Sequence, residues 1–150
     1  MDPVLILGIG NILLRDEGIG VRVVESLGRR ELPPGVEALD AGTAGADLVD
    51  LLADRRKVII VDAVDAGVPP GTILRLAPSD LAPDPGELLS LHQLGIVESL
   101  HMATQLRCSP QEVVIIGVQP GTIRPGLELS DDLQAALPEV VQAVLAELAG

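Results

Sequence analysis

The sequence contains no aromatic residue, since Trp, Tyr and Phe are all absent from its 150 residues. Its core must therefore be built from aliphatic side chains, and hydrophobic residues make up 47% of the chain. Basic residues are also scarce, with 10 Lys and Arg against 22 Asp and Glu, so the net charge is −12. Binding to nucleic acids relies on clustered basic residues and on aromatic stacking. We therefore expect no nucleic acid partner.

Cysteine and long apolar runs are equally scarce. The single Cys108 excludes an internal disulfide, which fits a reducing compartment. No apolar run approaches the roughly 18–20 residues that cross a bilayer, and the amino-terminal segment lacks the pattern of a signal peptide. We therefore expect a cytoplasmic protein without a membrane partner. The length suits a single domain over residues 1–150, which we expect to be a monomer.

Short β-branched runs alternate along the chain with stretches of helical periodicity. Strands are predicted at residues 4–9, 36–40, 57–61, 72–76 and 112–118, and helices near 20–27, 48–52, 90–106 and 130–148. This alternation indicates an α/β fold with a mostly parallel sheet covered on both faces. The connection before 72–76 is too short for a crossover, so that strand is expected to run antiparallel. Pro138 is expected to kink or restart the last helix.

Acidic residues follow the predicted strands. Glu17 comes after the first strand, Asp40 ends the second and Asp62 ends the third. The carboxyl ends of parallel strands meet at one edge, where ligands of open α/β sheets bind. Gathered carboxylates repel one another unless a cation, a proton or a basic partner is present. Asp62 ends a fully apolar strand, where a carboxylate is costly unless it is paired or coordinated.

His92 is the histidine expected at the same edge. Residues 90–93, Ser-Leu-His-Gln, fit a helix capping box, which places His92 in the first turn near the positive end of the helix dipole. That position favours the neutral imidazole that ligates metals. Together with Glu17 and Asp62 it forms a plausible site for Ni, Zn or Co. His101 lies nine residues later, so we expect it on the opposite face, in solvent.

Two further acidic residues have ordinary structural interpretations. Asp16 is placed to cap the helix that follows it. Asp40 is placed to accept hydrogen bonds from the glycine loop at 42–45. Both interpretations predict support of the backbone rather than contact with a ligand.

Several segments, in this order, resemble the hydrogenase maturation endopeptidases. The segments are Gly8–Gly20, Asp40–Gly45, Val61–Ala63, Leu91–Gly95 and Gly117–Pro120. The resemblance extends over nearly the whole chain, and its first segment is highly specific. It implies a three-layer α/β/α sandwich with a five-stranded mixed sheet and one antiparallel strand.

The resemblance also implies a function. Family members are endopeptidases, aspartyl-type or metal-assisted, that remove a C-terminal extension from the large-subunit precursor of a nickel–iron hydrogenase after nickel insertion. Glu17, Asp62 and His92 are then the catalytic residues that contact the nickel, which arrives with the substrate and which other divalent metals can replace in a crystal. The residues expected to support these three are Asn11, Asp16 and Asp40.

Two other interpretations stay open at the level of the residues. A receiver-like phospho-acceptor domain also pairs acids near its first strand with an Asp, here Asp62, at the end of its third. A receiver, however, needs a Lys at the end of its last strand, where this chain reads Gly-Val-Gln-Pro at 117–120. The third interpretation is a metal-binding domain without catalysis.

Overall fold

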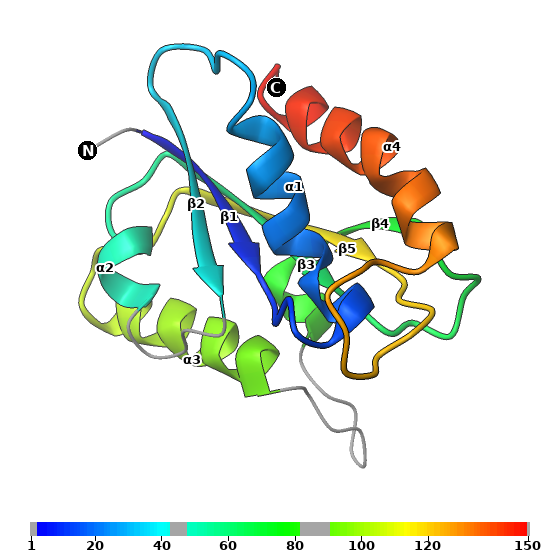
Figure 1. Cartoon of the computed structure of the whole chain (residues 1–150). Helices are drawn as coiled ribbons and strands as arrows, with labels where there is room; N and C mark the ends of the chain where they lie inside the picture. Colours follow the sequence, from blue (N-terminus) through cyan, green and yellow to red (C-terminus); the bar gives the residue numbers. More distant parts are fainter. Residues whose placement is uncertain (1–2, 43–47, 82–90, 150) are drawn as a thin grey trace.

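The computed structural model describes residues 3–42, 48–81 and 91–149, with only the backbone described for 91–94. A five-stranded sheet forms the centre of the molecule (Figure 1). Its strands are β1 (Val4–Ile9), β2 (Val36–Gly42), β3 (Lys57–Ala63), β4 (Ile73–Leu76) and β5 (Glu112–Val118). The order is β2-β1-β3-β5-β4, and only β4 runs antiparallel to its neighbour within this sheet. The predicted mixed sheet is therefore confirmed.

Helices cover both faces of the sheet, which confirms the three-layer architecture (Figure 1). One face packs against α1 (Ile19–Leu27) and α4 (Asp131–Glu147), and the other against α2 (Leu48–Leu52) and α3 (Leu91–Gln105). Two short 3-10 helices, η1 (Arg15–Gly18) and η2 (Pro78–Leu81), lie in the connections. Among the described residues no helix is both long and apolar enough to cross a membrane.

Two aliphatic clusters make the core, one on each side of the sheet. Every residue of β1 and β3 is buried, as expected for central parallel strands. Because side chains alternate across a strand, Ile59 and Val61 pack toward α1 and α4, whereas Val58 and Ile60 pack toward α2 and α3. The alternation continues to the end of β3, so Asp62 belongs to the face that α3 covers.

Helix α1 packs unusually close to the sheet because it contains Gly20. A Cβ atom at this position would lie 2.1 Å from the carbonyl oxygen of Val61 and 2.5 Å from that of Ile9. Any side chain would therefore push the start of α1 away from β1 and β3. The glycine fixes the first turn of α1 directly against the carboxyl ends of the two central strands.

An ionic network joins the end of α4 to the amino edge of the sheet, where β3 and β5 begin. Lys57, which is 3% exposed at the start of β3, donates to the Glu147 carboxylate over 3.1 Å and to the Glu147 carbonyl over 2.8 Å. It also lies 3.4 Å from the carboxylate of Glu112, and Arg75 of β4 donates to Glu147. The last turn of α4 is thereby joined to β3, β4 and β5.

Helix α4 runs through Pro138 without a restart, so that part of the prediction is wrong. Pro138 lacks the N–H that would donate to the carbonyl of Gln134. Both residues are exposed, so water can bond to that carbonyl. The free-energy cost of the missing hydrogen bond is therefore smaller than it would be in a buried helix.

Candidate functional site

The first loop brings Glu17 to the carboxyl edge of the sheet. Gly10 directly follows β1 with φ 133°, and a Cβ atom there would lie 1.9 Å from the carbonyl oxygen of Glu17. The chain therefore folds back so that η1 lies over the end of β1. Because Gly20 contacts the carbonyl of Val61, the same segment also reaches the end of β3. Glu17, which is half-buried, thus shares this edge with Asp62.

Asp62 is a buried carboxylate, 1% exposed, at the next-to-last position of β3. Its Oδ1 accepts a hydrogen bond of 2.8 Å from the N–H of Ala63, which orients the carboxyl group. The two residues before it on the same face, Val58 and Ile60, belong to the cluster that contains Ile96 of α3. The carboxylate is therefore an acidic group at the end of an otherwise apolar strand, on the side covered by α3.

His92 is the second residue of α3, and its side chain lies outside the described residues, as does the predicted cap at Ser90. The topology nevertheless fixes where α3 begins. The helix leads into β5, which is parallel to β3 and starts at the amino edge. Its 15 residues span about 22 Å, close to the roughly 23 Å of the seven-residue β5. The backbone of α3 therefore starts at the carboxyl edge.

No group of three His, Cys, Asp or Glu side chains that could hold a metal is present among the residues that the structure describes. The predicted site includes the imidazole of His92, and this side chain lies outside the part of the chain that the structure describes. Its role as a metal ligand stays a prediction, and so do the roles of Glu17 and Asp62.

Asp16 does not cap a helix, so this prediction is wrong. Gly18 occupies the cap position of α1, and the fully buried Asp16 carboxylate accepts four hydrogen bonds from the loop between β5 and α4. The donors are the N–H groups of Gly121 (2.8 Å), Thr122 (2.7 Å) and Ser130 (2.7 Å) and the Ser130 hydroxyl (2.7 Å).

These contacts also set the charge state of Asp16. Burial by itself raises the pKa of the carboxyl group, but the hydrogen bonds from Ser130, Thr122 and Gly121 outweigh it. The net pKa of Asp16 is below its ordinary value, so the group is a carboxylate at neutral pH. Asp16 thus holds a second loop against the one that carries Glu17.

Asn11 and Asp40 shape the backbone at the mouth of a surface cavity of about 430 Å³. The Asp40 carboxylate accepts a hydrogen bond of 2.7 Å from the N–H of Gly42, which confirms its predicted support of that loop as far as residue 42. The Asn11 side chain accepts one of 2.9 Å from the N–H of Leu13. Residues 10–13, Val21, Asp40 and Gly42 line the cavity.

Gln119 lies in the Gly117–Pro120 segment, but the sequence patterns give this side chain no role of its own. It is 6% exposed, accepts a hydrogen bond of 2.7 Å from the N–H of Ala66 and donates one of 3.0 Å to Asp65. The bond from Gln119, followed by one from the N–H of Gly67, holds the pKa of Asp65 below its usual range. Gln119 thereby fixes the segment that leaves β3 after Asp62.

His101 is exposed on α3, and one nitrogen of its ring lies 3.1 Å from the side-chain amide nitrogen of Gln105. This position confirms the prediction that His101 faces solvent. His101 is thus a second histidine on α3, and it lies at the surface.

Comparison with known proteins identifies the family. A family model described as hydrogenase maturation protease matches residues 21–147. The hydrogenase 2 maturation protease of Escherichia coli is 39% identical over 147 residues, which cover 97% of this chain and 90% of that protein.

Two solved structures agree with this result. The hydrogenase maturating endopeptidase HybD of E. coli superposes with a TM-score of 0.89 at 38% identity, covering 97% of this chain and 91% of its own. The [NiFe] hydrogenase maturation protease HycI of Thermococcus kodakarensis gives 0.79 at 26% identity, covering 99% and 94%. These matches favour the protease over the receiver-like and metal-carrier interpretations. The chain therefore belongs to the hydrogenase maturation protease family and is an endopeptidase.

Proposed function

We propose that this endopeptidase removes the C-terminal extension from the large-subunit precursor of a nickel–iron hydrogenase, and that Glu17, Asp62 and His92 recognise nickel in that precursor. The observation that carries the proposal is the buried carboxylate of Asp62 at the end of β3, at the edge of the sheet that the glycine-packed segment with Glu17 also reaches. The start of α3, with His92, lies at the same edge of the sheet.

Nickel is part of the substrate in this account. The precursor brings the ion on its own cysteine thiolates, and two carboxylates and one imidazole fill coordination positions that the precursor leaves open. This donor set suits a borderline divalent metal such as nickel. A site that requires a prebuilt metal centre discriminates strongly against a precursor that lacks it.

Cleavage then adds water across one peptide bond of the precursor. The attacking water needs activation, either by the nickel as a Lewis acid or by one of the two carboxylates as a general base. Asp16 and Gln119 keep the surrounding loops in place during this step through their hydrogen bonds. We place the reaction in the cytoplasm and assign it to the monomer.

The proposal is tested with the large-subunit precursor from the same organism, purified with and without nickel. Mass spectrometry after incubation with the protease should show a shortened large subunit only in the nickel-loaded sample. Equal shortening of the nickel-free precursor would remove nickel as the recognition element. If the loaded precursor stays intact, the assigned substrate is wrong.

Asp62→Asn tests the carboxylate directly, because the substitution keeps the size of the side chain and removes its charge. Loss of a ligand should lower the rate of processing by about 100-fold or more, since even residues that only support a metal site are worth about 10–100-fold. The comparison requires that the variant unfolds at a temperature near that of the wild type.

A further inference from the structure

Exposed apolar side chains are concentrated on two loops beside the candidate site. Five large hydrophobic side chains are exposed among the residues that the structure describes, and three of them lie in these loops. Leu13 (59% exposed) belongs to the loop before η1, and Ile123 (50%) and Leu127 (60%) to the loop between β5 and α4. We call these three side chains the apolar ridge.

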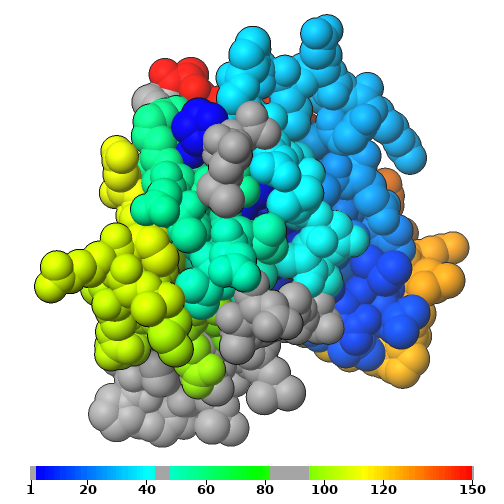
Figure 2. Space-filling view, turned by 90° about the vertical axis from the view of Figure 1, so that its left-hand side faces the viewer, coloured from blue at the N-terminus to red at the C-terminus, as the bar shows by residue number. Residues whose placement is uncertain are grey.

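Backbone hydrogen bonds join the two loops into one surface. The N–H of Gly126 donates to the carbonyl of Leu13 over 2.9 Å, and the N–H of Arg15 donates to the carbonyl of Gly126 over 3.1 Å. The N–H of Asp16 donates to the carbonyl of Thr122 over 3.0 Å. The blue and orange segments lie together in Figure 1 and again along one flank in Figure 2. The two loops that carry the ridge are therefore neighbours in space, although about 110 residues separate them in the sequence.

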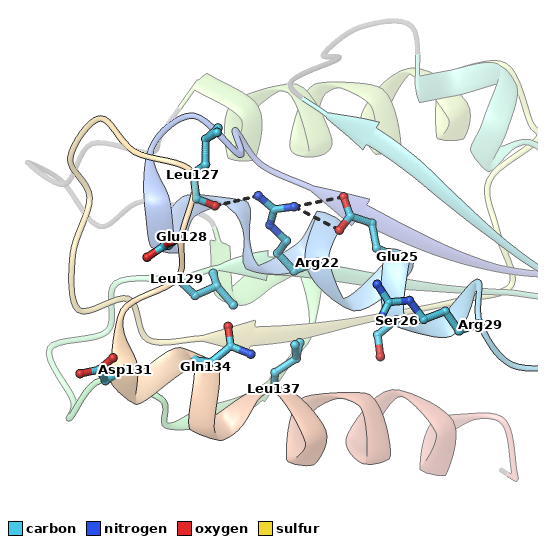
Figure 3. A pocket seen from close by; sticks show the side chains of 10 residues that line it. All are labelled: Arg22, Glu25, Ser26, Arg29, Leu127, Glu128, Leu129, Asp131, Gln134 and Leu137. Carbon is cyan, nitrogen blue, oxygen red and sulfur yellow. Dashed lines mark hydrogen bonds and ion pairs between the residues drawn. The ribbon is translucent and has the colours of Figure 1, made fainter.

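Arginine side chains hold the backbone of the second loop. Arg22 of α1 donates to the carbonyl of Leu127 over 2.8 Å, and Arg15 donates to the carbonyl of Glu128 over 2.9 Å. In Figure 3 the Leu127 side chain points away from the cavity of about 590 Å³ that its carbonyl borders. Leu127 is thus exposed on a fixed backbone, and a prearranged apolar group of this kind is typical of a binding surface.

We propose that the apolar ridge docks the large-subunit precursor and sets the affinity of the protease for it, an inference that rests on the proposed function. Leu13 precedes Glu17 by four residues in the same loop. A folded protein that delivers a peptide bond to Glu17 therefore comes close to Leu13 and to the loop that is bonded to it. Burial of two or three central apolar side chains commonly supplies much of the affinity of an interface.

Charge indicates the chemistry of the partner surface. Arg124 lies between Ile123 and Leu127 in sequence and is exposed, and its side chain has no hydrogen bond or ion pair within the described part of the chain. A cation here, on a chain of net charge −12, fits a carboxylate on the partner. The precursor should accordingly present an apolar depression with an acidic residue at its rim.

The test is the dependence of processing on the concentration of nickel-loaded precursor. The double variant Leu13→Ser/Leu127→Ser should raise KM by about tenfold or more and change kcat by less than about twofold, because binding is lost and the chemistry is not. Leu106→Ser is the matched control, since Leu106 is 62% exposed but lies past the end of α3, toward the amino edge. It should process like the wild type. Arg124→Glu should raise KM more at low salt than at high salt.

The possible results separate a failure of the docking surface from a failure of the proposed function. If the wild type processes the precursor and the double variant has an unchanged KM, the proposed function stands and the docking surface is wrong. If the wild type does not cleave, biolayer interferometry with the same precursor decides the inference alone. Tight binding by the wild type and loss in the double variant would uphold the ridge, whereas equal binding by both or by neither would overturn it. A dimer of the protease that the double variant disperses, with KM unchanged, would assign the ridge to a second copy instead.

Discussion

A single buried carboxylate, Asp16, joins two loops that are far apart in the sequence. Its two oxygens accept four hydrogen bonds from residues 105 to 114 positions away. One of these loops continues into Glu17 and the other carries Ile123 and Leu127. The residue thus connects the stability of the molecule to the position of both the candidate site and the apolar ridge.

Asp16→Asn should lower the free energy of unfolding by about 1–3 kcal/mol at neutral pH, because an amide cannot accept all four hydrogen bonds and its NH₂ group opposes one of the donors. The pKa of Asp16 is lowered in the folded protein, so its contribution is fully present above the ordinary value near pH 4 and is lost as the pH falls through the lower folded value. Urea unfolding of both proteins between pH 7 and pH 3 measures this. The difference between them should shrink in acid, and a constant difference would contradict the assignment.

The sequence correctly predicts that Glu17 and Asp62 lie at the carboxyl edge of the sheet, but the predicted cap at Asp16 is wrong. The first two follow strands whose carboxyl ends meet at one edge by topology alone. The partners of Asp16 are Gly121, Thr122 and Ser130, and no local pattern in the sequence links them to it. A residue that contacts a distant loop looks like a helix cap when only its neighbours in the chain are considered.

Whole elements were easier to predict than single contacts. The strand predicted at 112–118 matches β5, and the short connection before β4 correctly indicated its antiparallel direction. Strand β3 extends to Ala63 and so includes Asp62, because β5 continues beside it to Val118. Hydrophobic periodicity records which face of an element is buried, whereas the ends of elements depend on their neighbours in the sheet.

Lys57 is the residue that joins α4 to the sheet. Lys57→Met should lower the free energy of unfolding by about 1–3 kcal/mol, because it removes the buried cation from between the carboxylates of Glu112 and Glu147. Chemical denaturation measures the loss. Glu25→Gln is the control for an exposed ion pair, and breaking its contact with Arg22 should cost less than about 0.5 kcal/mol.

The pH dependence of the same network follows from Glu147. Its hydrogen bond from Arg75, assisted by Lys57, lowers its pKa, so the network is intact at neutral pH and weakens as the pH falls through the lowered value. Lys57 lies at the amino edge, so processing by folded Lys57→Met should equal that of the wild type. A loss of processing without a loss of stability would contradict the separation of the two edges.

The two edges of the sheet carry different groups of residues. The amino edge carries the network of Lys57 and Glu147, and the carboxyl edge carries the candidate site and the apolar ridge. The α/β pattern predicts this division, because parallel strands bring their carboxyl ends together. The ridge was not predicted, since it forms only when the loops at residues 13 and 123–127 are joined by backbone hydrogen bonds.

We propose that a histidine at the start of α3 completes the site with Glu17 and Asp62. The decisive measurement compares His92→Ala with His101→Ala, two identical truncations on one helix, in the processing of nickel-loaded precursor. We expect His92→Ala to abolish processing while the protein stays folded, and His101→Ala, at an exposed position, to retain the wild-type rate. If His92→Ala processes the precursor at the wild-type rate, the imidazole is not part of the site.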